Sequence, residues 1–203
     1  MKHPSTRALF AYWNERRGKR PAPEREDIDP VAIRQVLGDT FMLAADFVDE
    51  HRFRLAGTRV CALFCRELKG ESFPGLWNEA SHAGIVELLA TMASETAGAV
   101  AGVTGYAANG ARLDLEMLVL PLAHRGHARI RALGTLSPID VPYWLGESPL
   151  GELELGVVRN LGKDVETVLQ PRFASAPAGS QIRHGFIVYK GGRQPPPPTE
   201  RTG

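Results

Sequence analysis

The sequence predicts an α+β protein, and three observations carry this prediction. Two alternating stretches on either side of Asn109-Gly110 indicate a β-hairpin, because both positions tolerate positive φ and favour a two-residue turn. Apolar residues at helical spacing over 85–96 indicate a long helix before this hairpin. Alternating stretches over 41–47 and 52–55 indicate an earlier hairpin. Helices and antiparallel strands therefore follow one another along a chain of 203 residues.

Two helices and a connector are predicted in residues 1–38. Ser5 is a good N-cap, so the first helix is expected to begin there. The polar segment that follows contains two prolines and is expected to be a connector. Asp29-Pro30 then combines a capping carboxylate with proline at the first helical position, which predicts a second, short helix that ends at Gly38.

The middle of the chain is predicted to contain two helices and then a run of strands. A compact apolar run over 58–64 follows Gly57 and predicts a short helix. A longer helix follows Trp77 and is closed by Gly98. The strands expected next form an antiparallel meander and cover residues 100–108, 112–122 and 127–132.

The pattern weakens after Pro138. Residues 151–161 and 185–189 each have the character of a strand, and the Ala/Pro/Gly/Ser-rich stretch 174–180 is expected to be a flexible loop. Four consecutive prolines begin at Pro195, and they predict a disordered tail rather than a polyproline ligand.

Charge and cysteine content exclude several classes of function. The chain has 24 Lys and Arg against 23 Asp and Glu, a net charge of +1, so general attraction to nucleic acid or to a membrane is not expected. Two cysteines are too few for a disulfide framework. The N-terminus lacks a signal-peptide pattern, and no window approaches the roughly 18 apolar residues of a membrane span. A cytoplasmic, reducing setting is therefore predicted.

Two blocks of sequence carry a resemblance to a known family. The second block, residues 53–77, places a short amphipathic strand before Gly57, then a compact helical run, then Glu67-Leu68-Lys69-Gly70. The first block contains Tyr12-Trp13-Asn14, Arg20, Pro21, Pro23, Asp27-Ile28-Asp29-Pro30 and Ile33. Over about residues 8–140, this order of blocks resembles a PAS-like family of bacterial proteins whose function is mostly unassigned.

The resemblance implies a PAS-like fold, in which a five-stranded antiparallel sheet has helices on one face. On this view the chain consists of N-terminal helices and connector (1–38), a PAS-like core (39–142), a C-terminal extension with added strands (143–192) and a disordered proline-rich tail (193–203). PAS-like domains are sensory or regulatory modules that commonly form homodimers. A small apolar ligand, a protein partner in signalling and a homodimer are therefore the expected partners.

The candidate ligand site is the interior between the first hairpin, the short helix and the meander. The inward-facing side chains there would either line an apolar pocket or simply pack together as a filled core, and the sequence leaves both alternatives open. The candidate pocket-lining residues are Phe41, Leu43, Phe53, Leu55, Cys61, Phe64, Met92, Leu115 and Met117.

No cofactor is identified from the sequence. The string Cys65-Arg66-Glu67-Leu68-Lys69-Gly70 is similar to that of light-sensing flavin domains, but Phe73 holds the place that their reactive cysteine would take. His82, near the start of the long helix, is a weak candidate for a haem ligand. The cofactor therefore stays unknown, with haem and flavin both disfavoured.

No metal site or catalytic residue is predicted. Cys61 and Cys65 are interpreted as small reduced thiols, because zinc sites use closer cysteine spacing and two further ligands. His124 and His127 flank a turn and are expected to be solvated.

Asp114 and Glu116 share a strand face opposite the apolar side chains, so solvated charge is expected there rather than acid–base chemistry. The basic cluster Arg16, Arg17, Lys19 and Arg20 is followed by acidic residues and is interpreted as a solvated connector.

Three functions remain open on the sequence alone. The favoured hypothesis is a stand-alone sensory or regulatory module without catalytic activity, which acts by binding a small ligand or a protein partner. The alternatives are a purely structural interaction protein with a filled core, and an isomerase- or hydratase-like enzyme with a pocket in an α+β cone. The enzyme would need a buried carboxylate or histidine that faces the pocket.

Overall fold

The computed structural model describes residues 1–45, 51–123, 130–161, 180–183 and 186–189. The chain divides into two compact units, Met1–Thr167 and Val168–Gly203. In the second unit, strands β7 (Ser180–Arg183) and β8 (Phe186–Tyr189) pair as an antiparallel hairpin. The expected strand at 185–189 is thus present. The predicted proline-rich tail and all but the last residue of the predicted 174–180 loop lie outside the described residues.

The first unit is built on one antiparallel sheet of six strands in the order β2-β1-β5-β4-β3-β6. The resemblance implied five strands. The sixth is the strand that the sequence predicted over 151–161, and it pairs with β3. The strands are β1 (Thr40–Ala45), β2 (Arg52–Ala56), β3 (Gly98–Ala107), β4 (Arg112–Leu122), β5 (Ile130–Pro138) and β6 (Leu150–Leu161).

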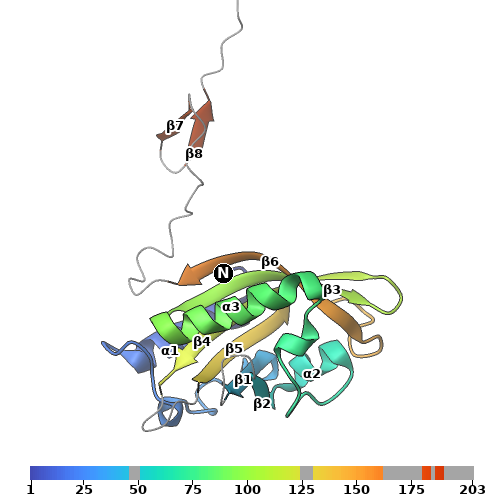
Figure 1. Ribbon diagram of the computed structural model, residues 1–203, viewed down its shortest axis with the longest axis horizontal. Helices are drawn as coiled ribbons and strands as arrows, with labels where there is room; N and C mark the ends of the chain where they lie inside the picture. Colours follow the sequence, from blue (N-terminus) through green and yellow to red (C-terminus); the bar gives the residue numbers. More distant parts are fainter. Residues whose placement is uncertain (46–50, 124–129, 162–179, 184–185, 190–203) are drawn as a thin grey trace, which may run out of the picture. The chain divides into compact units, whose positions relative to one another are not determined.

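Helices cover both faces of this sheet: the helices of the predicted PAS-like core lie on one face, and the additional N-terminal helix lies on the other. Helix α3 (Glu79–Glu95) lies in front of the strands in Figure 1 and α1 (Pro4–Arg17) lies behind them. We call the face that carries α3 and α2 (Thr58–Phe64) the inner face, and the face that carries α1 the outer face. Three short 3₁₀ helices complete the fold: η1 (Arg25–Asp27), η2 (Leu37–Asp39) and η3 (Pro74–Leu76).

The main core lies between the inner face and helices α2 and α3. Ile85, Leu89 and Met92 of α3 are buried there, which confirms the helical spacing read from the sequence. Gly134 of β5 lies opposite Phe41 of β1. A Cβ atom at Gly134 would lie 2.4 Å from the Phe41 ring, so only glycine leaves room for this aromatic side chain in the core.

Local details of three predicted elements differ. The segment after Pro30 forms no α-helix; it makes successive turns with i→i−3 hydrogen bonds, such as Val36 N–H to Ile33 O, and its residues Ile33 and Val36 are buried. The N-cap of α1 is His3, because Pro4 takes the first helical position. In the β3–β4 turn only the glycine has positive φ, at 80°.

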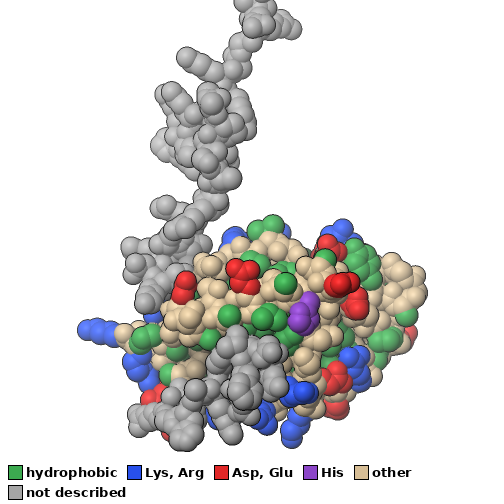
Figure 2. All heavy atoms as spheres, in the orientation of Figure 1, with side chains coloured by type: hydrophobic (Ala, Val, Ile, Leu, Met, Phe, Trp, Pro, Cys, Tyr) green, Lys and Arg blue, Asp and Glu red, His purple; other side chains and the backbone are tan. Residues whose placement is uncertain are grey.

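Charges of both signs lie on the face of the molecule that Figure 2 shows. Figure 2 shows Lys and Arg side chains interspersed with Asp and Glu over the face that carries α3. This distribution agrees with the net charge of +1 for the whole chain. Within the described residues, no helix is both long enough and apolar enough to cross a membrane.

Candidate functional site

The predicted pocket-lining residues come together with one exception. Eight of the nine are buried in the single core cluster of the inner face, whereas Leu55 is 46% exposed. The aromatic members contact other rings directly: the centroid of Phe73 lies 5.4 Å from that of Phe41, 5.6 Å from that of Phe53 and 5.9 Å from that of Trp77. The interior beneath β1 and β2 is therefore occupied by stacked and edge-to-face rings.

Leu55 lies on the outer face because a β-bulge interrupts the β1–β2 pair. Met42 pairs with Leu55, but the next residue, Leu43, pairs with Phe53, so Arg54 is the extra residue. A bulge changes the face to which following side chains point. The alternation in the sequence predicted Leu55 on the same face as Phe53, and this part of the prediction is wrong.

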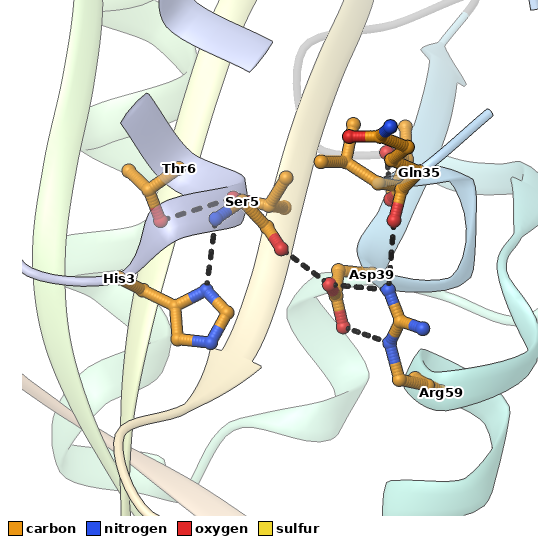
Figure 3. Close-up of polar contacts among 9 residues, drawn as sticks. His3, Ser5, Thr6, Gln35, Asp39 and Arg59 are labelled. Atoms are coloured by element: carbon orange, nitrogen blue, oxygen red, sulfur yellow. Dashed lines mark hydrogen bonds and ion pairs between the residues drawn. The ribbon is translucent and has the colours of Figure 1, made fainter. Parts of the chain in front are cut away.

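Asp39 connects α1, η2 and α2 through charged hydrogen bonds (Figure 3). Its side chain is buried and accepts from the Ser5 hydroxyl at 2.5 Å. Arg59 of α2 donates Nε and Nη2 to the two carboxylate oxygens at 2.7 and 2.8 Å. This bidentate geometry is the strongest arrangement available to an arginine–carboxylate pair.

Glu116 holds the N-terminal end of α1 against β4. Its side chain is only 5% exposed and accepts hydrogen bonds from the backbone N–H groups of Lys2, at 2.6 Å, and His3, at 2.8 Å. A carboxylate at this position also complements the positive end of the helix dipole. The expectation that Glu116 would be solvated is wrong, because α1 covers the face on which it lies. Asp114 agrees with the expectation, since it is exposed and pairs with Arg112.

Further contacts hold the rest of α1 on the outer face. The hydroxyls of Thr6 and Thr135 lie 3.4 Å apart, and Trp13 donates its indole N–H to the Pro121 carbonyl at 2.8 Å. Leu9 is fully buried. We call Ser5, Asp39, Arg59 and Glu116 the helix-anchor site.

Both buried carboxylates of the helix-anchor site are kept ionised by their hydrogen bonds. Burial opposes ionisation of Asp39, but the bonds from Arg59 and Ser5 outweigh it, so its pKa is lowered. Burial likewise opposes ionisation of Glu116, but the amides of Lys2 and His3 outweigh it and lower that pKa too. Neither carboxyl is held in the protonated form that a general acid needs at neutral pH.

These lowered pKa values predict that acid weakens the attachment of α1. A carboxyl with a lowered pKa in the folded state contributes stability above its unfolded pKa of about 4, and this contribution is lost as pH falls through the folded value. We expect wild-type protein to lose more free energy of unfolding between pH 6 and pH 3 than Glu116→Gln, which has no charge to titrate there. Urea titrations at both pH values measure the difference, and equal losses would contradict the prediction.

The other candidate metal- or haem-binding groups that the structure describes are two cysteines and one histidine. Cys61 is buried and Cys65 is exposed; burial raises the pKa of the Cys61 thiol. His82 is exposed on α3. Among the described residues no group of three or more His, Cys, Asp and Glu side chains is placed to hold a metal ion. His124 and His127 lie outside the described residues.

The arginines of the basic cluster contact residues of α1 and of the connector that follows it. Arg16 lies over the Tyr12 ring, and Arg17 lies over the Trp13 ring. Arg20 pairs with Asp27 at 2.8 Å. Arg16, Arg17 and Arg20 therefore have local partners, but Arg16 and Arg17 belong to the last turn of α1 and not to the connector.

Sequence reasoning did not identify Asp39, Ser5 or Arg59 as site residues. A polar residue directly before a buried strand, as Asp39 is before β1, was the available signal. This signal was not specific, because polar residues before a strand are also common at the ends of ordinary turns.

The sequence comparison agrees with this geometry. A family model described as a PAS domain matches residues 1–137, from the N-terminus through almost all of β5. The chain therefore belongs to the PAS domain family. No curated protein matches the chain. The matched region includes α1 and the connector, while β6 lies beyond it.

Proposed function

We propose that this protein is a PAS-type sensory or regulatory module without catalytic activity, which acts through contacts made at its outer face. The observation that carries the proposal is the contrast between the two faces. The interior, for which the sequence left a pocket and a filled core open, contains aromatic rings in contact with one another. The outer face holds a helix through two ionised, buried carboxylates.

Such a module would transmit its signal by a change in the position of α1. Its N-terminal end is held by Glu116 and Asp39, and ionic hydrogen bonds of this kind can be exchanged for contacts with a ligand or a partner. Release of the helix would expose Leu9, Trp13 and the strand residues beneath them. An apolar surface of this kind suits a protein partner or a second copy of the chain. A homodimer is therefore part of the proposal.

Native mass spectrometry of the purified full-length protein, together with its absorbance spectrum, tests the proposal. A dimer, or a reproducible added mass, at micromolar concentration is the expected result. A bare monomer at every concentration up to tens of micromolar would count against both the homodimer and a tightly held ligand.

The aromatic packing also favours a second candidate, a purely structural interaction protein with a filled core. The two candidates differ in whether α1 responds to binding. Hydrogen exchange of the α1 amides, measured with and without the bound partner or second copy, separates them: a regulatory module changes the protection of α1, and a structural protein leaves it unchanged.

A further inference from the structure

A groove of about 340 Å³ opens on the outer face where β1 and β2 meet the connector. Its floor is apolar, with Met42 and Leu55 opposite each other on the neighbouring strands. Three of the residues that line the groove are arginines. The lining residues, which we call the arginine groove, are Arg25, Met42, Leu43, Ala44, Arg54, Leu55 and Arg131.

The three guanidinium groups come from separate parts of the fold. Arg25 belongs to η1, Arg54 is the extra residue of the β-bulge, and Arg131 lies on β5 opposite Ala44. The bulge is what places Arg54 and Leu55 together at this groove. The site therefore depends on the tertiary fold and not on one run of basic sequence.

These arginines have no counter-ion in the described part of the chain. Arg20, Arg59, Arg66 and Arg112 each pair with a carboxylate, but no ion pair or side-chain hydrogen bond involves the guanidinium of Arg25, Arg54 or Arg131. Nε of Arg131 is buried without a hydrogen-bond partner. Arginine cannot lose its charge, so three cations around one groove favour binding of an anion.

We propose that the arginine groove binds a small organic anion, in which a carboxylate or phosphate group is joined to an apolar body. Guanidinium groups match both oxyanions with bidentate geometry, and the apolar floor takes the body of the ligand. This inference rests on the proposed function, because it names the ligand class to which the regulatory module would respond.

The geometry favours a small ligand over an acidic peptide added to the sheet. The outer edge of β2 is already paired: Phe53 donates its N–H to Glu71 O and accepts from the N–H of Gly70. This part of the β2 edge, at Arg52 and Phe53, is therefore not available to an extended chain. The volume of the groove also lies at the lower end of the range for small-molecule sites.

Titration of the full chain with three ligands of the same apolar body tests the proposal: octanoate, octyl phosphate and neutral 1-octanol. Methyl NMR signals of Met42 and Leu55 report on the floor of the groove. We expect at least one anion to shift these signals and to bind about tenfold or more tightly than octanol, since hydrogen bonds to charged groups contribute this much. The preferred anion identifies carboxylate or phosphate as the recognised group.

Arg54→Gln and Arg131→Gln are expected to weaken binding of that anion about tenfold or more. Arg159→Gln removes the same charge on β6, at the opposite edge of the sheet, and is the matched control. Arg54 is exposed, so Arg54→Gln is expected to fold and keeps the test valid even if Arg131→Gln does not fold.

The proposal is overturned if neither anion shifts the NMR signals of the groove, if octanol binds as tightly as the anions, or if both groove variants bind the anion as wild type does. Mass spectra of the same samples report dimerisation separately, so failure here is distinct from failure of the proposed function.

Discussion

Truncation of Phe73 to alanine is expected to lower the free energy of unfolding by about 3–5 kcal/mol. Phe73 is fully buried and its ring contacts those of Phe41, Phe53 and Trp77. The substitution removes the central ring of this cluster and leaves a cavity. For a domain of this size the loss corresponds to a decrease in Tm of roughly 10 °C, which calorimetry measures.

The cavity in Phe73→Ala gives the experiment a second readout. An apolar cavity stays dry and accepts a ligand such as benzene, so benzene should raise the Tm of the variant and leave wild type unchanged. Tyr143→Ala is the control, because this aromatic side chain is 95% exposed. Stabilisation of wild type by benzene to the same extent would show that the interior already has an open pocket, and would contradict the packed arrangement.

Replacement of Glu116 by alanine is expected to lower the free energy of unfolding by about 3 kcal/mol, since two amides lose a charged acceptor. The loss should fall on α1, so the amides of this helix should exchange with solvent faster than those of α3. Urea titration measures the first effect, and hydrogen exchange with mass spectrometry measures the second.

Asp114→Ala is the matched control for Glu116→Ala. It removes the same charge two positions away on the same strand, but Asp114 is exposed and its partner Arg112 is also exposed. A surface pair of this kind contributes little to stability. If both variants lose the same stability, Glu116 does not anchor α1, and the role of this helix in the proposed function fails with it.

The spacing of apolar residues and the turn signals correctly predicted the bounds of some helices and strands. Helix α2 occupies the predicted residues, Thr58–Phe64, and β4 occupies the predicted Arg112–Leu122. In both, the apolar spacing and the adjacent turn signals agree, so a single sequence is enough. Turn signals predicted the pairing of neighbouring strands, such as β3 with β4, but only the family resemblance placed the two hairpins in one sheet.

The candidate site was harder to predict because it depends on contacts distant in sequence. Alternation along β4 correctly placed Glu116 on the face opposite Leu115 and Met117. It did not show that a helix more than 100 residues earlier covers this face. The predicted face of Leu55 was wrong for a similar reason. A β-bulge is a mismatch in length between two paired strands, and the sequence of one strand does not reveal it.

Strand β6 has a consequence for where this protein can be divided. The family match ends at residue 137, but β6 begins at Leu150 and covers the free side of β3 along most of its length. Leu153 of β6 is also fully buried in the core. A fragment cut at the family boundary would expose β3 as an unprotected sheet edge, which is a template for aggregation. We therefore expect a soluble fragment of this protein to need β6, which lies beyond the residues that the family model matches.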